Sequence, residues 1–452
     1  MVVQKFGGTS VADPDAIRRL INIARSARTR DSRGPIVVVS AMSRVTDALL
    51  TVAADAGSSQ LDRALAQIDQ LRARHVATAK ALVPSADAAP LLEAIDQQFD
   101  ELAAVARALG VLREVSVRTL DVVAAIGELL SSRIVAAACV HEGLPAVWVD
   151  ARRVIVTNDD HTCAVPLMRE TVAALRASVM PLIDAGQVPV LGGFVGATPA
   201  GHTTTLGRGG SDYSGALVGA GVDAAEIQLW TDVDGMLTAD PRLIPQPRLV
   251  PQLSFAEAAE LAYFGAKVLH PSTIHPAVER NIPVRILNSW KPDAPGTLIT
   301  ADPPVSATPL TAMAAKRDVT VVDVTSDRML MAYGFLRQVF EVFERFRTAV
   351  DVVTTSEVSV SVTVDDRRNL DAIVEALSEF AEVVVEPEMA LLCAVGDRLR
   401  NEPGIGARVI RVLEEVPLRM ISQAASRRNI TVILRQGDLQ HAMQRLHEEF
   451  FT

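Results

Sequence analysis

Two kinds of hydrophobic pattern alternate along the chain. Short apolar runs at 2–3, 36–39 and 188–191 lead directly into glycine or hydroxyl residues, which is typical of buried parallel strands followed by turns. Longer stretches at 57–110 and 116–140 place apolar residues at helical spacing. Together these patterns predict an α/β arrangement, with helices packed on a sheet.

The first strand-to-turn junction carries a lysine and two glycines. The sequence Lys5-Phe6-Gly7-Gly8 follows the first apolar run, and Asp13-Pro14 then supplies an N-cap with proline at the first helical position. Paired glycines and a helix N-terminus favour a bound phosphate, and Lys5 would add a positive charge. Taken alone, the stretch is better explained as an ordinary glycine turn.

A second glycine-rich stretch lies at 203–216. It places Gly207, Arg208, Gly210 and Asp212 within six residues, at the start of an Ala/Gly-rich helix. Arginine and aspartate held at such close spacing indicate a site for carboxylate and phosphate groups. The chain contains neither GxxxxGK[ST] nor GxGxxG, which excludes a Walker A loop and the dinucleotide fingerprint.

Hydroxyl and acidic residues at other element ends are weaker candidates. Ser40 and Thr46 follow the strand at 36–39, where open α/β sheets bind ligands, although Thr46 or Asp47 would also suit a helix cap. Glu128 lies in a mostly apolar helical stretch. By itself, Glu128 is better explained by a solvated helix face than by a site.

Composition limits the class of protein. The length of 452 residues predicts two or three domains, and the net charge of −10 argues against a dedicated nucleic-acid binder. Three dispersed cysteines indicate reduced thiols in the cytoplasm, not a disulfide frame or a zinc site. No apolar run is expected to reach the length of a membrane span, and a strand at the N-terminus argues against a cleaved signal peptide.

The C-terminal third has a different organisation. Prolines cluster between 295 and 309, which predicts a domain boundary. Beyond it, the pattern strand, helix, strand, strand, helix, strand occurs twice, with matching helices at 368–379 and 437–449. The sequence therefore predicts a repeated α+β unit of about 70 residues.

Six motifs in this order resemble those of the aspartokinases, in the amino-acid kinase superfamily. They read KFGGTSV from 5, SAMSRVTD from 40, GELLSS from 127, TLGRGGSDY from 205, WTDVDG from 230 and FGAKVLHP from 264. Further stretches, TTSEVSV from 354 and MISQ from 420, resemble the paired ACT domains of this family. The likeness covers essentially the whole chain and is greatest to the lysine-sensitive monofunctional type.

The resemblance implies the fold and the reaction. The expected catalytic domain is an αβα sandwich of the carbamate-kinase-like type at 1–298. Two ferredoxin-like ACT domains follow at 309–380 and 381–452, with a first strand that can be exchanged between them. The implied reaction transfers the ATP γ-phosphoryl group to the side-chain carboxylate of L-aspartate. The product is 4-phospho-L-aspartate, in the first step of the lysine, threonine and methionine pathway.

The resemblance also assigns residues to roles. Lys5 reaches the transferred phosphate and Asp212 orients it, while Arg208 pairs with the α-carboxylate of aspartate and Glu128 accepts its ammonium. The implied aspartate site comprises Ser40, Thr46, Glu128, Phe194, Arg208 and Ser211. The implied ATP site comprises Lys5, Gly7, Gly8, Thr231, Asp232, Arg242 and Lys267. Mg²⁺ is expected on the phosphate oxygens, with no protein ligand assigned.

An effector site is implied in the first ACT domain, for lysine or threonine. Its residues would be Met329, Gly334, Phe335, Leu336, Asp351, Thr355, Ser356 and Glu357. Three positions depart from the family pattern. Ala332 and Ala349 stand where lysine-binding relatives carry hydroxyls, and Leu237 stands where relatives often place an aromatic residue against adenine. An ACT pair that only dimerises is the alternative.

Three other readings of the whole chain remain open. One is a related kinase that acts on another carboxylate, such as glutamate. A second is an amino-acid sensor without activity, against which the intact Lys5, Arg208 and Asp212 argue. The third is the kinase part of a fusion enzyme, which the chain end soon after the last helix disfavours. ACT domains usually pair across subunits, so a homodimer or larger homo-oligomer is expected, without nucleic acid or membrane as partner.

Overall fold

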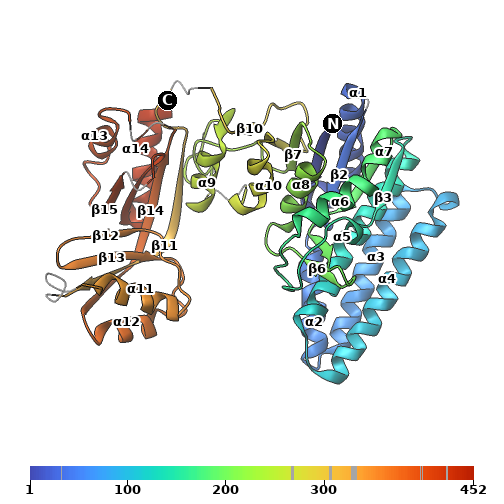
Figure 1. Cartoon of the computed structure of the whole chain (residues 1–452), viewed down its shortest axis with the longest axis horizontal. Helices are drawn as coiled ribbons and strands as arrows, with labels where there is room; N and C mark the ends of the chain where they lie inside the picture. Colours follow the sequence, from blue (N-terminus) through green and yellow to red (C-terminus); the bar gives the residue numbers. More distant parts are fainter. Residues whose placement is uncertain are drawn as a thin grey trace. The chain divides into compact units, whose positions relative to one another are not determined.

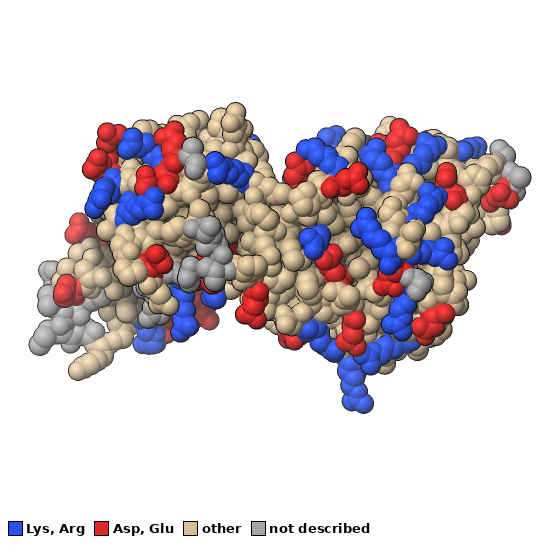
Figure 2. Space-filling model, turned by 90° about the horizontal axis from the view of Figure 1, so that it is seen from above, with Lys and Arg blue, Asp and Glu red and all other residues tan. Residues whose placement is uncertain are grey.

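The chain forms two compact units in the computed structural model (Figure 1). Unit 1 comprises Met1–Met236 and His270–Asp302, and unit 2 comprises Leu237–Leu269 and Pro303–Thr452. The structure describes residues 1–31, 33–265, 269–304, 308–326, 333–397, 399, 401–423 and 426–451. On the face shown in Figure 2, lysine and arginine residues are interspersed with aspartate and glutamate.

The core of unit 1 is a mainly parallel sheet. Within unit 1 the strand order is β3-β4-β2-β1-β7-β9-β10, and among these seven strands only the β9–β10 pair is antiparallel. The strands are β1 Val2–Phe6, β2 Pro35–Val39, β3 Ala146–Val149, β4 Val188–Gly192, β7 Glu226–Thr231, β9 Val284–Asn288 and β10 Thr297–Thr300. Because β1 lies between β2 and β7, its end is surrounded by the ends of its neighbours.

Helices cover this sheet. They are α1 Pro14–Arg30, α2 Val45–Gly57, α3 Leu61–Leu82, α4 Ser85–Leu112, α5 Val117–His141, α6 Met168–Ser178, α7 Met180–Asp184, α8 Gly210–Gly221 and α10 His275–Glu279. Short 3₁₀ segments lie at Gly8–Val11, Ala151–Arg153 and Pro271–Ile274, and a hairpin is formed by β5 Val195–Ala197 and β6 Thr203–Thr205. The predicted cap is confirmed: Asp13 accepts a hydrogen bond from the Ala16 backbone, and Pro14 is the first helical residue.

One expectation about membranes needs correction. Helix α5 is long and apolar enough to cross a membrane by length and composition, and it is the one such helix in the described ranges. However, 83% of its most apolar window is buried inside the protein. Its high hydropathy is therefore that of a core helix, which packs on α2, β3 and β4.

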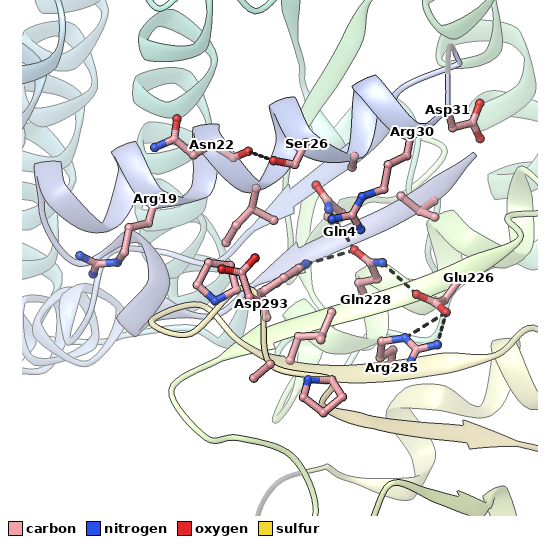
Figure 3. A pocket seen from close by; sticks show the side chains of 18 residues that line it. Gln4, Arg19, Asn22, Ser26, Arg30, Asp31, Glu226, Gln228, Arg285 and Asp293 are labelled. Atoms are coloured by element: carbon pink, nitrogen blue, oxygen red, sulfur yellow. Dashed lines mark hydrogen bonds and ion pairs between the residues drawn. The ribbon is translucent and has the colours of Figure 1, made fainter.

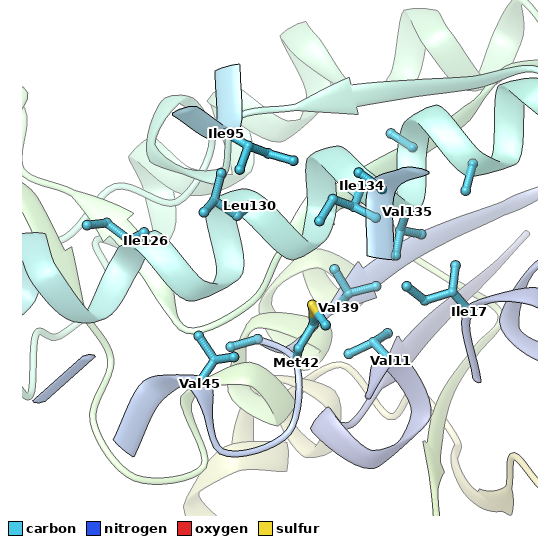
Figure 4. Packing of buried hydrophobic residues seen from close by; sticks show 14 of the residues in the cluster. Val11, Ile17, Val39, Met42, Val45, Ile95, Ile126, Leu130, Ile134 and Val135 are labelled. Carbon is cyan, nitrogen blue, oxygen red and sulfur yellow. The ribbon is translucent and has the colours of Figure 1, made fainter. Parts of the chain in front are cut away.

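The packing under α5 fixes the turn after β2. Ile126, Leu130 and Ile134 of α5 share one hydrophobic cluster with Met42 and Val45 (Figure 4). Met42 and Val45 are each 1% exposed. Because these two side chains anchor the turn in the core, the intervening polar positions are held at the sheet edge.

Unit 2 contains an antiparallel sheet in the order β12-β13-β11-β14-β16-β15. The strands are β11 Ala312–Thr325, β12 Val353–Thr355, β13 Ser359–Val364, β14 Glu382–Val395, β15 Leu418–Gln423 and β16 Asn429–Arg435. The helices are α11 Phe335–Arg345, α12 Leu370–Ser378, α13 Ile405–Val412 and α14 Leu439–Phe451, with a 3₁₀ turn at Gln436–Asp438. Strand β8 Gln252–Ser254 leads into α9 Phe255–Tyr263, which begins with a Ser254–Glu257 capping box.

Strands β11 and β14 each serve both halves of this sheet. Residues 312–316 pair with 391–395, whereas 319–325 pair with 382–389 and also with β13. The start of β11 therefore extends the half that contains β15 and β16, and the start of β14 extends the half that contains β12 and β13. The two repeats exchange their first strands in this way.

Candidate active site

A cavity of about 510 Å³ lies in unit 1 at the carboxyl ends of β1, β2 and β7. Open α/β sheets bind ligands at this edge. The cavity is lined by eleven of the residues assigned by resemblance: Lys5, Gly7, Gly8, Ser40, Thr46, Glu128, Phe194, Arg208, Ser211, Asp212 and Thr231. Segments up to about 230 residues apart in the sequence therefore meet at one site.

An ion pair forms the centre of the cavity. The Lys5 ammonium lies 2.7 Å from Asp212 Oδ1, and the two side chains are 10% and 26% exposed. Helix α8 brings Asp212 to the end of β1, and Gly215 on the same helix makes room for Lys5: a Cβ there would lie 3.1 Å from Lys5 Cβ. The lysine charge is therefore held in place while one side of the pair stays open to the cavity.

The glycine turn after Lys5 works differently from the sequence-based expectation. The Gly7 N–H donates to the Trp230 carbonyl at 2.9 Å, so this donor is already used inside the protein. Gly8 is needed for close approach, because a Cβ on it would lie 3.1 Å from the Ala41 carbonyl oxygen. The turn thus ties β1 to β7 and to the Ser40 segment around the Lys5 ammonium.

Glu128 is a buried carboxyl facing this cavity, and not part of a solvated helix face. It is 3% exposed, and its Oε2 atom has no hydrogen-bond partner among the described residues. Burial raises the pKa of Glu128 from 4.5 to about 8, although a backbone hydrogen bond from Ala41 and the Lys5 charge act in the opposite direction. A buried carboxyl with a raised pKa and an unpartnered oxygen beside a cavity is a candidate ligand-binding group.

Arg208 is the exposed cation of the second glycine-rich stretch. It lies between Gly207 and Gly209, whose φ angles of +74° and +71° favour glycine. Arg208 forms no ion pair with any residue that the structure describes. Its guanidinium is therefore available for a ligand carboxylate, for which a planar fork of donors is suited.

Phe194 is held in a strained backbone conformation beside Ser211. Its φ of +64° is rare for a bulky residue, and its backbone is fixed by hydrogen bonds from its N–H to Ser214 Oγ at 2.8 Å and from Leu206 N–H to its carbonyl at 2.9 Å. A side chain on Gly193 would lie 2.8 Å from Ser211 Cβ. Strain that the surroundings enforce so tightly is typical of a binding site.

Of the three other residues assigned to ATP, one lies in unit 1, one lies in unit 2 and one falls outside the described residues. Asp232 is exposed and bonds to Thr231, but it does not line the cavity. Arg242 belongs to unit 2, where it pairs with Asp240 at 2.6 Å, and Lys267 lies outside the described residues. Thr46 and Asp47 do not cap α2: its N-cap is Arg44, and no side chain caps it.

The sequence-based assignment missed Arg44. It lines the cavity, is exposed and forms no ion pair within the described ranges. Arg44 lies in the turn between β2 and α2, and its backbone φ is +66°. Such a conformation is uncommon outside glycine and asparagine, so the sequence carried no local signal for it.

A buried carboxylate beneath the Arg208 stretch was also missed. Asp121 on α5 is fully buried and accepts hydrogen bonds from His161 Nδ1 at 2.6 Å, from the Thr162 N–H at 3.0 Å and from Thr205 Oγ1. It therefore clamps the loop around 161 to the end of β6, three residues before Arg208. Asp121 lies two helical turns from Glu128 on the same face of α5, a spacing that could have identified it.

Replacing Asp121 tests this positioning. In Asp121→Ala the three donors lose their acceptor, and a buried donor left without a partner, as Thr205 would be, costs about 1–3 kcal/mol of stability. We expect a lower melting temperature and a raised KM for the substrate whose carboxylate Arg208 would bind, with a smaller change in kcat, and partial recovery in Asp121→Asn. Asp160→Asn in the same loop, at an exposed position, is the control. A lowered kcat with an unchanged KM would contradict a positioning role.

The residues assigned to an effector lie in unit 2. Gly334, with φ +92°, precedes α11; Phe335 is buried, and Leu336 is 41% exposed. Asp351 is already engaged, since Lys316 pairs with it at 2.9 Å and the Tyr263 hydroxyl donates to it at 3.0 Å. An ammonium ligand at Asp351 would therefore have to compete with Lys316.

The remaining effector positions lie at a strand end and in the turn after it. Thr355 ends β12, and Ser356 and Glu357 form the turn that follows. Met329 and Ala332 lie outside the described residues, and Ala349 is exposed.

Comparison with known proteins identifies the family of this chain. Family models match for the amino acid kinase family over residues 1–288 and for an ACT domain over residues 392–450. Aspartokinase 3, chloroplastic, of Arabidopsis thaliana is 38% identical over 466 residues, which cover 99% of this chain and 81% of the relative.

Two solved structures of E. coli aspartokinase III are similar over their whole length. One is a complex with lysine and aspartate (T-state), and the other is a complex with aspartate and ADP (R-state). Each is 34% identical, and the match covers 100% of both chains, with TM-scores of 0.83 and 0.82.

The parallel sheet, the cavity at its carboxyl edge and the family match define an amino acid kinase fold followed by C-terminal ACT domains. The predicted fold class is confirmed. Within that superfamily, the chain belongs to the aspartokinases.

Proposed function

We propose that this chain transfers the ATP γ-phosphoryl group to the side-chain carboxylate of L-aspartate. The observation that carries the proposal is the shared cavity, where the Lys5–Asp212 pair lies with an unpaired Arg208 and a buried Glu128. The E. coli relative in complex with aspartate and ADP supports the choice of substrates. The product is 4-phospho-L-aspartate.

The chemistry requires charge and positioning more than a base. An aspartate side chain has a pKa near 3.9, so at neutral pH the attacking carboxylate is already ionised. The barrier comes from bringing this anion onto the phosphoryl group, and Lys5 lowers it by placing a cation on the phosphoryl oxygens. Asp212 holds the Lys5 ammonium in position at 2.7 Å. Arg44, exposed in the same cavity, adds a second cation.

Substrate selection follows from the two ends of an α-amino acid. Arg208 binds the α-carboxylate, and Glu128 accepts the ammonium in its ionised form. Phe194, Ser40, Thr46 and Ser211 complete the pocket. Because a buried carboxylate and a free guanidinium both require a partner, a ligand that lacks either charge is rejected.

ATP is proposed to enter as its Mg²⁺ complex. In this proposal the ion is held by phosphate oxygens and water, as is usual for Mg²⁺ with nucleotides, and no protein ligand is assigned to it. The bound ion would neutralise part of the phosphate charge. Thr231 lines the nucleotide side of the cavity, and roles for Asp232, Arg242 and Lys267 remain part of the proposal.

An aspartate-dependent ADP-release assay tests the reaction directly. We expect ADP to form with ATP and L-aspartate, and the acyl phosphate to be trapped by hydroxylamine as the hydroxamate. L-Glutamate, one methylene longer, should be used at least about tenfold less well, since an extra methylene in a fitted pocket costs about 1–3 kcal/mol. Faster turnover with glutamate would overturn the substrate assignment, and ADP release without either would overturn the reaction.

Replacing Arg208 separates substrate binding from chemistry. We expect Arg208→Ala to raise the KM for aspartate by about 10- to 150-fold, because a hydrogen-bonded charge contributes roughly 1.5–3 kcal/mol. The KM for ATP should change little. Arg176→Ala, an exposed arginine paired with Asp223 on the surface of unit 1, is the control. An unchanged aspartate KM would remove Arg208 from the site.

We further propose that ACT domains at 309–380 and 381–452 regulate a catalytic domain at 1–298 and join subunits in a homo-oligomer. The complex of the E. coli relative with lysine supports an amino-acid effector. Steady-state assays with lysine, threonine and methionine, singly and in pairs, test this regulation. We expect inhibition by at least one, weakened in Glu357→Gln and retained in the exposed control Glu341→Gln. A response to none of them favours an ACT pair that only joins subunits.

A further inference from the structure

Unit 1 contains a second, larger cavity on another face of the sheet. Its volume is about 610 Å³, within the range of roughly 300–1,000 Å³ that is usual for ligand pockets. Strands β1, β7 and β9 form its floor, and α1 and the loop at 292–295 form its walls (Figure 3). Gln4 lines this cavity, whereas the adjacent Lys5 lines the catalytic one. Side chains of successive strand residues point to opposite faces, so the two cavities are separate.

A ladder of polar side chains crosses the floor. The Gln4 amide donates to Gln228 Oε1 at 2.9 Å, the Gln228 amide donates to Glu226 Oε1 at 2.8 Å, and Arg285 donates to Glu226 Oε2 at 3.0 Å. The Trp230 indole N–H lies 3.3 Å from Gln228 Oε1. Amides and charges on the inner face of a helix-covered sheet are unusual, since such faces are normally apolar.

Two buried polar atoms beside the cavity have no hydrogen-bond partner among the described residues. Gln4 is 1% exposed, and its Oε1 atom accepts no hydrogen bond from the described residues. Arg19 Nε, in the α1 wall, is likewise buried without an acceptor, while its guanidinium carbon lies 4.0 Å from the centre of the Trp290 ring. Buried polar atoms without partners are rare in folded proteins. Here one acceptor and one donor are both unsatisfied beside the same cavity.

Two opposite charges at the cavity are also unpaired. Arg30 on α1 and Asp293 in the loop line it, and neither forms an ion pair within the part of the chain that the structure describes. The other carboxylates of the lining are satisfied, because Glu226 pairs with Arg285 and Asp31 with the N-terminal ammonium. Figure 3 shows the Arg30 side chain extending from α1 towards the floor that Gln4 and Gln228 form.

We propose that this cavity binds a small zwitterion with an apolar body, namely an apolar α-amino acid. Its carboxylate would pair with Arg30 and accept from Arg19, and its ammonium would pair with Asp293 and donate to Gln4 Oε1. The buried Ile23, Trp230 and Leu287 supply apolar surface for the side chain. A plain anion would leave Asp293 and Gln4 without partners, and a plain cation would leave Arg19 and Arg30 without theirs.

Calorimetric titration of the full chain with L-leucine, L-isoleucine and L-phenylalanine tests the site. We expect saturable 1:1 binding of at least one of them. Leucinamide lacks the carboxylate and N-acetyl-leucine lacks the ammonium, so each should bind at least about tenfold more weakly than leucine, the usual loss for a charged hydrogen bond. Absence of binding for all three amino acids, or equal binding of the blocked analogues, would overturn the proposal.

Variants then locate the bound amino acid. Arg30→Gln and Asp293→Asn change exposed residues, so both should fold normally, and each should weaken the Kd roughly tenfold. Arg33→Gln, an exposed arginine outside the cavity, should bind as the wild type does. If Glu357→Gln in unit 2 abolishes binding while Arg30→Gln leaves it intact, the amino acid occupies unit 2 and the proposal fails. Because these experiments measure binding, they test this proposal independently of kinase activity.

Discussion

Replacing Lys5 by alanine should reduce kcat by roughly 30- to 5,000-fold, since removing one partner of a close charge pair in a site costs about 2–5 kcal/mol. The physical reason is that no other residue places a fixed cation at the Asp212 carboxylate: the 2.7 Å contact of Lys5 is the only ion pair of Asp212 among the described residues. The KM for aspartate should change much less, because Arg208 and Glu128 are the residues proposed to bind its charged ends. Steady-state kinetics with both substrates varied checks this split.

The control for Lys5 lies in the same unit. Lys291 forms an exposed ion pair with Asp234 at 2.8 Å, and Lys291→Ala should leave kcat unchanged. Asp212 is 26% exposed, so it stays solvated when Lys5 is removed and the fold should persist. Circular dichroism and the melting temperature verify that point. A Lys5→Ala protein with near-normal turnover would mean that the cation on the phosphoryl group comes from elsewhere, with Arg44 the first candidate.

Local sequence signals predicted the elements of this site well. Lys5, the two glycines and the Asp13–Pro14 cap are all read from neighbouring residues, and the structure contains that strand, turn and capped helix. The contact between Lys5 and Asp212 could not be read in this way. It depends on α8 packing against β1 from about 200 residues away, and only the motif order that resembles aspartokinases joined the two segments.

Residues whose role depends on tertiary context were misjudged or missed. From the helical pattern alone, Glu128 was interpreted as a residue on a solvated helix face. The sequence of this helix does not show which face β4 and the Ser40 turn cover. Gly7 was expected to offer its N–H to phosphate, yet β7 already accepts it. Asp121 and Gln4 are polar residues that neighbouring strands and loops enclose. Their significance follows from burial, which a single sequence does not display.

Burial of Glu128 links stability to function. Its pKa of about 8 in the folded chain lies above the ordinary 4.5, so between these values the folded state binds more protons than the unfolded state. The free energy of unfolding therefore falls as pH rises from about 4.5 towards about 8. A Glu128→Gln side chain carries no charge to desolvate. We expect that variant to melt at a higher temperature than the wild type near pH 8, with the difference shrinking towards pH 5.

The same carboxyl should make aspartate binding depend on pH. Only ionised Glu128 can accept the substrate ammonium, so below about pH 8 the KM for aspartate should rise by up to about tenfold for each unit of pH. Glu128→Gln should raise that KM by roughly 30- to 5,000-fold and abolish its pH dependence, through loss of a close charge pair. Glu142→Gln, an exposed carboxylate at the end of the same helix, should match the wild type. A wild-type KM that is flat from pH 6 to 8 would instead require Glu128 to be ionised throughout, with a cation other than the substrate beside it.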